Sequence, residues 1–321
     1  MQAAPVPTAP AWRQALSREE LRELLELHDW RSWLSIASTW GLIALALALV
    51  ARWPNPLTVV VALFVIGARQ LGLAVLMHEA SHRTLLASRR WNDWVGNWLC
   101  AYPIWSDIHP YRAYHLRHHA RTWTKDDPDL ALAAPFPITR ASLARKVWRD
   151  LSGQTGWKRL QATLRRDLGP PRATGPSRGR GRRALGAGRR ALPGVVVTNV
   201  VLAGILTAAG HPALYLLWIA AWLTTYSLAM RLRSIAEHAM VPDPGDPLGN
   251  TRTTLARWWE RLLVAPNRVN FHLEHHLLPT VPHYALPRMH RLLRERGVLD
   301  RACIAPGYVA VLRQAASAVT A

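Results

Sequence analysis

The sequence predicts an all-α integral membrane protein with four transmembrane helices arranged in two hairpins. Two long segments of the 321-residue chain, residues 32–77 and 191–230, are almost free of charge. Each is interrupted by a turn signal, Pro54-Asn55-Pro56 in the first and Gly210-His211-Pro212 in the second. Because about twenty apolar residues cross a bilayer as a helix, two spans fit into each segment. We place them at residues 32–51, 57–77, 194–210 and 212–230. Two buried hairpins of a soluble protein are the alternative, which runs of this length disfavour.

Composition excludes several other classes of protein. With 50% hydrophobic residues, the chain is too apolar to be disordered throughout, and its net charge of +20 is concentrated rather than spread. Residues 78–193 hold 22 basic and 8 acidic residues. The two cysteines, Cys100 and Cys303, form neither a disulfide framework nor a C-x-x-C metal motif.

The arginines also predict the orientation. The turn after the first span holds only Arg52, and the turn at His211 holds no lysine or arginine. By the positive-inside rule, the N-terminus, the long middle segment and the C-terminus should face the cytoplasm. Arg69 interrupts the second span, so it should lie near the interface or face the protein interior.

The segments outside the spans are less regular. Residues 1–31 read as a tail and a short amphipathic helix, with a capping box at Ser17 and Glu20 and an end near Trp30. This helix could lie on the membrane surface or pack on the protein. Residues 169–193 are rich in Arg, Gly and Pro and predict a flexible loop, or a segment that contacts anionic lipid headgroups. They lack the interleaved aromatics of a nucleic-acid-binding segment, and we expect no nucleic-acid partner.

Histidine-rich motifs occur three times, each close to an apolar span. The first is H-x-x-x-H, and the second and third are both H-x-x-H-H. Residues three and four apart share one helical face, so the imidazoles of each motif can reach one metal. A ninth histidine follows the last span. The predicted ligands are His78, His82, His115, His118, His119, His238, His272, His275 and His276.

All nine histidines lie in segments predicted to be cytoplasmic, where they can meet in one layer. Nine imidazoles are too many for one metal ion and suit two. An almost all-nitrogen site fits Zn, Cu, Fe or Ni, so the spacing alone does not name the metal.

Taken together, the three motifs resemble those of the membrane fatty acid desaturase family, from about Trp33 to Arg296, with residues 271–279 (FHLEHHLLP) as the closest local match. The resemblance implies four transmembrane helices with a cytosolic helical cap that holds two non-haem irons, and it carries all nine histidines over as ligands. The first motif has three intervening residues where the acyl-CoA branch has four. Residues 32–296 would form the membrane domain and residues 297–321 a C-terminal tail.

Further residues have candidate roles around this site. A metal-bound imidazole usually donates its second N–H to an acceptor, and six carboxylates are close enough in sequence to serve: Glu79, Glu237, Glu274, Asp126, Asp127 and Asp129. Trp94 and Trp98, one turn apart, would form either an interfacial aromatic belt or a wall of a substrate tunnel. The remaining histidines are expected to be structural: His28, His109, His211, His283 and His290.

The expected function is therefore that of a membrane-bound di-iron oxidoreductase. It would use O2 and external electrons to introduce a double bond into a fatty acyl or related lipid chain, bound as an acyl-lipid, on an acyl carrier or in another form. The chain has no H-P-G-G motif, cysteine cluster or G-x-G-x-x-G, so a separate ferredoxin or cytochrome b5-like donor with its reductase should supply the electrons. The alternatives are a hydroxylase or ketolase of a lipid or isoprenoid, a zinc-dependent membrane hydrolase and a non-catalytic lipid-binding membrane protein.

Overall fold

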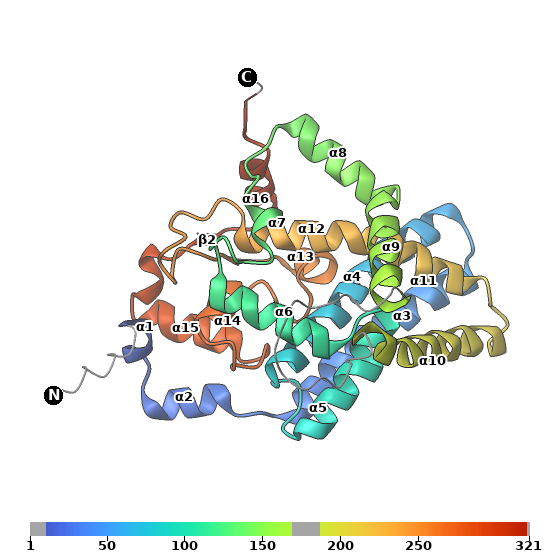
Figure 1. Cartoon of the computed structure of the whole chain (residues 1–321), viewed down its shortest axis with the longest axis horizontal. Coiled ribbons are helices and arrows are strands. Elements are labelled where there is room, and N and C mark those ends of the chain that lie inside the picture. Colours follow the sequence, from blue (N-terminus) through green and yellow to red (C-terminus); the bar gives the residue numbers. More distant parts are fainter. Residues whose placement is uncertain (1–10, 169–186, 320–321) are drawn as a thin grey trace, which may run out of the picture.

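The computed structural model describes residues 11–168 and 187–319, which are mostly helical (Figure 1). The apolar helices α3, α4, α10 and α11 gather on the right of Figure 1, whereas α2, α14 and α15 lie on the left and α6 and α12 run between them. The longer helices are α2 (Arg18–Leu25), α3 (Asp29–Arg52), α4 (Pro56–His82), α6 (Ile108–Arg121), α8 (Arg140–Leu151), α9 (Gln154–Leu168), α10 (Ala187–Ala208), α11 (Leu214–Leu223), α12 (Thr225–His238), α15 (Leu286–Glu295) and α16 (Tyr308–Ala315).

Short elements connect these helices. They are α1 (Ala11–Gln14), α5 (Arg89–Val95), α7 (Leu130–Ala133), α13 (Trp258–Leu263), α14 (His272–Leu277), a π-helix (Gly96–Ala101) and the 3-10 turns Tyr102–Ile104, Pro266–Arg268 and Val298–Arg301. Two short strands, β1 (Thr253–Thr254) and β2 (Ile304–Ala305), pair in parallel, with Thr253 opposite Ile304.

Three helices in the described part of the chain are long and apolar enough to cross a membrane: Asp29–Arg52, Pro56–His82 and Ala191–Ala208 of α10. They contain most of the first three predicted spans. The second of them, α4, begins with Asn55 as its N-cap and Pro56 at the first helical position. It continues past the predicted span to His82, so the first histidine motif lies on the same rigid helix. Arg69, on this helix, faces the protein interior and is only 6% exposed.

The predicted fourth span, residues 212–230, is not one continuous helix. The structure breaks it at Thr224, whose φ of −110° and ψ of −88° are not helical. Packing contacts hold the break. Arg159 donates to the carbonyl of Trp222, which a continuous helix would pair with the N–H four residues later. On the other side, a Cβ at Gly67 would lie 2.2 Å from Thr225 Oγ1, so this side of the break accepts only glycine. These contacts come from α9 and α4. The local sequence of the span therefore could not predict the break.

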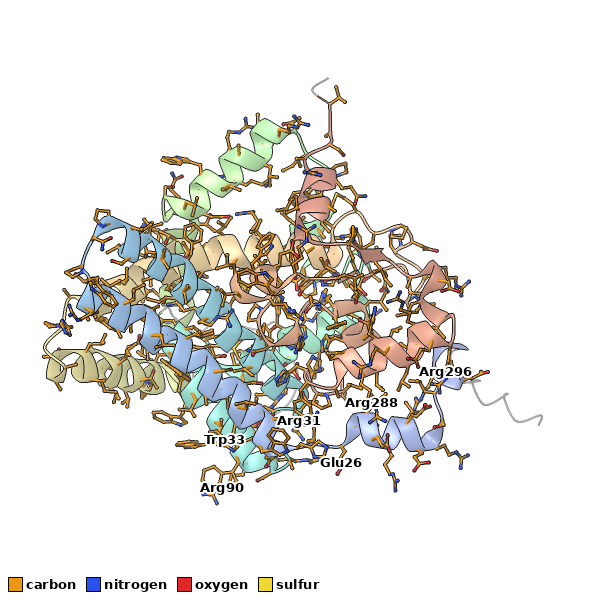
Figure 2. The ribbon with its side chains drawn as sticks, turned by 180° about the vertical axis from the view of Figure 1, so that it is seen from behind. Glu26, Arg31, Trp33, Arg90, Arg288 and Arg296 are labelled. Carbon is orange, nitrogen blue, oxygen red and sulfur yellow. The ribbon has the colours of Figure 1, made fainter. Side chains whose placement is uncertain are left out.

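The N-terminal amphipathic helix packs on the domain. The capping box of Ser17 and Glu20 forms as predicted, but the helix α2 ends at Leu25 and Trp30 belongs to α3. Leu24 is fully buried in a cluster with residues of α14 and α15. Arg296, directly after α15, donates to Glu20 at 2.6 Å, and Arg288 of α15 pairs with Glu23; Figure 2 shows both arginines directed towards α2. Of the two alternatives left open by the sequence, the structure shows packing on the protein.

The flexible segment predicted at residues 169–193 lies mostly outside the described residues. Its last part is helical, because α10 begins at Ala187. Near the other end of the chain, Tyr308, Val311 and Ala315 of α16 are buried in the main core together with residues of α4 and α12. Residues 297–319 are therefore folded onto the domain.

Candidate metal centre

Four helices bring the nine predicted histidines to one place. The last two turns of α4 carry His78 and His82, α6 carries the second motif, α14 carries the third, and α12 ends at His238. Helix α6 starts at Asp107, whose carboxylate accepts from the N–H of His109. Helix α14 is held by an antiparallel bridge between Phe271 and Thr253, which joins it to β1. Six of the nine side chains are buried and three are partly buried.

The histidines divide into two sites. Five of them, from α4, α6 and α14, place one ring nitrogen each within 4.8 Å of one another: His78, His82, His115, His119 and His275. The other four come together with one carboxylate in two overlapping groups, which share His238. These groups are His118, His238 and His276, and Glu237, His238 and His272. Each site therefore offers at least four potential ligands.

Burial favours the neutral form of six of these imidazoles. Burial, and after it the repulsion of neighbouring imidazoles, lowers the pKa of six histidines that lie outside the apolar spans: His115, His119, His238, His272, His275 and His276. A neutral imidazole has a lone pair available for a metal. The cluster therefore combines several such lone pairs in a volume from which solvent is largely excluded.

The pairing of the ring nitrogens fits a metal site. Nε2 atoms face each other at 2.9 Å between His115 and His119 and at 2.9 Å between His238 and His272. Five further ring nitrogens of the cluster are buried and have no hydrogen-bond partner: Nε2 of His78, His82, His118 and His276, and Nδ1 of His275. Buried polar atoms normally have partners, and a cation at each site would satisfy the four Nε2 atoms among these.

Two carboxylates fix the ring orientation of predicted ligands. Glu79 Oε1 lies 3.2 Å from His78 Nδ1, and Asp127 Oδ1 lies 2.8 Å from His118 Nδ1. In both cases Nδ1 carries the proton, so the unpartnered Nε2 presents its lone pair to the cluster. Asp127 is itself held by the N–H groups of Trp123 and Asp129, each at 2.9 Å.

The other four predicted carboxylates differ in position. Glu237 Oε1 lies 3.5 Å from His272 Nδ1 and accepts from Arg233 Nε at 2.6 Å. Asp129 Oδ2 lies 3.6 Å from His118 Nδ1. Glu274 contacts His290 Nδ1 at 2.6 Å rather than any of the nine histidines. Asp126 is exposed, and the one hydrogen bond it makes in the described structure runs from its own N–H to Thr124.

Two histidines that we expected to be structural, His283 and His290, contact buried carboxylates of the histidine motifs. His283 donates its backbone N–H to Glu79 Oε2 at 2.9 Å, and its Nε2 lies 2.8 Å from Ser35 Oγ of α3. His290 holds Glu274, which also accepts from Thr253 Oγ1. No spacing rule links either histidine to the motifs, because both approach from the segment after α14. A partner for each buried carboxylate is required in general, but the sequence does not say which residue supplies it.

Trp94 and Trp98 line neither the narrow cavity beside the histidine cluster nor the two larger cavities of the protein. With Trp91 and Tyr102 they form a row of aromatic contacts, whose ring centroids are 5.4–6.1 Å apart. Trp94 is 48% exposed. This row favours the interfacial belt over the tunnel wall.

Two cavities differ in their relation to the cluster. A narrow cavity of about 10 Å³ lies directly beside it and is lined by His78, His272 and His275 together with Asn267 and His283. An apolar cavity of about 310 Å³ lies between α9, α10 and α11 and is lined by none of the nine histidines.

Helical architecture, membrane-length apolar helices and two groups of clustered histidines define an integral-membrane type of protein with a centre able to bind metal. Comparison with known proteins agrees with this class. The family model for fatty acid desaturase matches residues 54–303, and the chain belongs to that family. A curated relative, the dihydrorhizobitoxine desaturase of Bradyrhizobium elkanii, is 26% identical over 297 residues, which cover 86% of this chain and 79% of the relative. The chain is thus a desaturase-type oxidoreductase.

Proposed function

We propose that this protein is a membrane-bound di-iron oxidoreductase that introduces a double bond into a fatty acyl or related lipid chain. The observation that carries the proposal is the division of the nine histidines into two adjacent groups, each able to hold one metal ion. Membership of the fatty acid desaturase family favours iron over the other metals that nitrogen ligands accept. The name of the relative supports formation of a double bond as the reaction.

The ligands would be the nine histidines in the two groups described above, with Glu237 beside the second. Bound there, two irons would supply the oxidation of an unactivated C–H bond with O2 and external electrons, chemistry that acidic and basic side chains cannot perform alone. The protein itself contributes ligand orientation. Glu79 and Asp127 hold His78 and His118 with the proton on Nδ1, and the buried setting excludes water from the centre.

Topology and electron supply complete the proposal. With four membrane crossings, the last formed by α11 and the first part of α12, the N-terminus, the C-terminus and the histidine cluster lie on the cytoplasmic side. The basic residues then face the cytoplasm, as the positive-inside rule requires. A ferredoxin or cytochrome b5-like protein with its reductase would deliver the electrons, because the sequence has no motif for a second redox centre.

The reaction is tested by comparing lipids and metabolites of cells that express the wild-type chain with cells that express His118→Ala. The proposal expects a product with one double bond more than its precursor, present only with the wild-type chain. A product that gains one oxygen would assign the chain to hydroxylation or ketone formation instead. An unchanged profile, with the wild-type protein present in the membrane and loaded with iron, would contradict the proposal.

A further inference from the structure

A third cavity, larger than the two described above, shares Asn267 and His283 with the narrow cavity beside the histidine cluster and is rich in arginine. Its volume is about 530 Å³, within the usual range for ligand pockets. Four arginines from four separate places in the chain line it: Arg31 at the start of α3, Arg69 in the middle of α4, Arg261 in α13 and Arg268 in the following 3-10 turn. Apolar side chains, including Trp30, Leu34 and Pro266, complete the lining.

These four positive charges are not neutralised within the described part of the protein. None of the four arginines forms an ion pair there, although other arginines do, such as Arg112 with Asp93 and Arg231 with Asp150. Burial, and then the nearby charge of Arg261, lower the pKa of Arg268. Arg31, Arg261 and Arg268 are exposed, so an anionic group that enters the cavity from solvent can reach them.

Arg69 is the one buried arginine among the four that line the cavity. Its side chain is 94% buried, and its terminal nitrogen donates to the carbonyls of Arg261 and Leu262 at the end of α13. Its Nε has no hydrogen-bond partner and no contact with solvent. The hydrogen bonds to the end of α13 therefore satisfy the terminal nitrogen of Arg69, whereas Nε is left without a partner.

Two adjacent residues at the cavity have an unusual backbone conformation. Asn267 and Arg268 both have positive φ, 52° and 61°, and neither is glycine. Such a conformation costs about 1–3 kcal/mol per residue and persists where the surroundings enforce it. Here Asn267 Nδ2 donates to the carbonyl of Gly72 at 3.0 Å, which fixes the turn against α4. The turn thus holds Arg268 at the cavity.

The position of the cavity restricts the ligand. Trp30, 63% exposed, lies at its rim, and tryptophan favours the headgroup level of a membrane. Figure 2 shows Arg31 near the place where α2 meets α3. Asn267 and His283 line both this cavity and the narrow cavity at His78 and His275. A ligand here would have an anionic group, an apolar part and access to the neighbourhood of the metal centre.

We propose that this arginine-lined cavity binds the anionic headgroup, a carboxylate or a phosphate monoester, of an amphiphilic substrate. Guanidinium groups suit both anions, because their paired N–H groups match two oxygens at once. The identification of the ligand as the substrate rests on the proposed function, whereas the binding of an anionic amphiphile does not.

Binding of tritiated palmitate to the full-length, iron-loaded protein in non-ionic detergent tests this proposal. Hexadecyl phosphate should compete with palmitate, whereas hexadecanol, which has the same chain and no charge, should compete at least about tenfold more weakly. Arg31→Gln and Arg261→Gln should each raise the Kd for palmitate about tenfold, because each removes a charged contact. Arg52→Gln, at the other end of α3 and outside the cavity, is the matched control and should leave Kd unchanged.

Several results would overturn the proposal. Equal competition by hexadecanol would show that the anion is not recognised, and competition by inorganic phosphate as strong as that by palmitate would show a site for free anions. Competition by dioleoyl phosphatidylcholine, whose headgroup has no net charge, as strong as that by palmitate would indicate a general lipid site. A Kd for palmitate that is unchanged in both variants would show that these arginines do not recognise the anionic headgroup. The absence of any binding of palmitate and hexadecyl phosphate would also contradict the proposal.

Iron content and melting temperature, measured on the same samples, show whether a variant has simply unfolded. The outcome is also separable from that of the proposed function. Selective palmitate binding without any oxidised product in cells would leave the anion site standing and contradict the reaction. An oxidised product in cells, together with arginine variants that bind palmitate normally, would support the reaction and contradict the anion site.

Discussion

Asp127→Asn tests whether the orientation of a predicted metal ligand, His118, matters when the ligand itself is unchanged. In the structure the two carboxylate oxygens of Asp127 accept from three groups: His118 Nδ1 at 2.8 Å, and the N–H groups of Asp129 and Trp123 at 2.9 Å each. Asparagine has nearly the same shape, but one of its two terminal atoms donates instead of accepting. Therefore one of these contacts must be lost, whichever way the amide turns.

Both orientations of the amide have a calculable cost. If the amide oxygen faces His118, the buried N–H of Trp123 loses its acceptor, which lowers the free energy of unfolding by about 1–3 kcal/mol. If the NH2 group faces His118, Nδ1 must become the acceptor and the proton moves to Nε2, which can then no longer bind a metal. Loss of such an orienting partner costs about 10–100-fold in metal affinity, or about 1.4–2.7 kcal/mol.

The assay is retention of iron during dialysis against increasing concentrations of a chelator, with the melting temperature measured in parallel. Asp126→Asn is the matched control, because Asp126 is the preceding residue, is exposed and contacts none of the nine histidines. We expect Asp127→Asn to lose iron at a lower chelator concentration than the wild type, to melt at a lower temperature, or both, and we expect Asp126→Asn to behave like the wild type. The reasoning is refuted if Asp127→Asn retains both iron and stability, or if both variants lose iron equally.

Three further predictions concern the topology, the electron donor and pH. Reporter fusions after Arg31, within residues 169–193 and after Ala321 should read cytoplasmic and a fusion at His211 external; an external reading within 169–193 would break the four-crossing arrangement. Turnover with an acidic donor protein should show a donor KM that rises with salt more than kcat falls, since the donor meets a basic face; a salt-insensitive KM, or full activity with NADH alone, would contradict this. The metal-free protein should lose stability as pH falls below about 6.5, because unfolded histidines then bind protons that the buried ones, with lowered pKa, do not; the slope is about 1.4 kcal/mol per pH unit for each such histidine. A melting temperature that is the same at pH 7.5 and 5.5 would show that these histidines are not buried as described.

Local patterns in the sequence predicted those features that depend on local structure. His78 and His82 are one helical turn apart, so their shared face follows from the helix alone. Likewise, the capping box of Ser17 and Glu20 forms between residues three apart and is present in the structure. The charge-free runs predicted helices of membrane length, and three such helices are found.

The features that the sequence missed depend on contacts between distant residues. The break at Thr224 is enforced by Arg159 and by the close approach of Gly67, neither of which lies in that span. The contact of His283 with Glu79 joins residues about two hundred positions apart, and His283 belongs to no motif. The arginine-lined cavity likewise combines single arginines from four segments, each of which looks like an ordinary interfacial or surface residue by itself.

The central claim, two irons held by the two histidine groups, is tested most directly by the iron content and Mössbauer spectrum of the purified full-length protein. The protein would be stripped of metal, reloaded anaerobically with isotopically enriched Fe²⁺ and passed through a desalting column. We predict about two irons per chain with the spectrum of high-spin non-haem iron in nitrogen-rich coordination. His275→Ala, in the five-histidine group, and His118→Ala, in the other, should each reduce the bound iron, while His211→Ala should not. One iron or fewer per chain in the wild type, or iron unaffected by both His275→Ala and His118→Ala, would contradict the account.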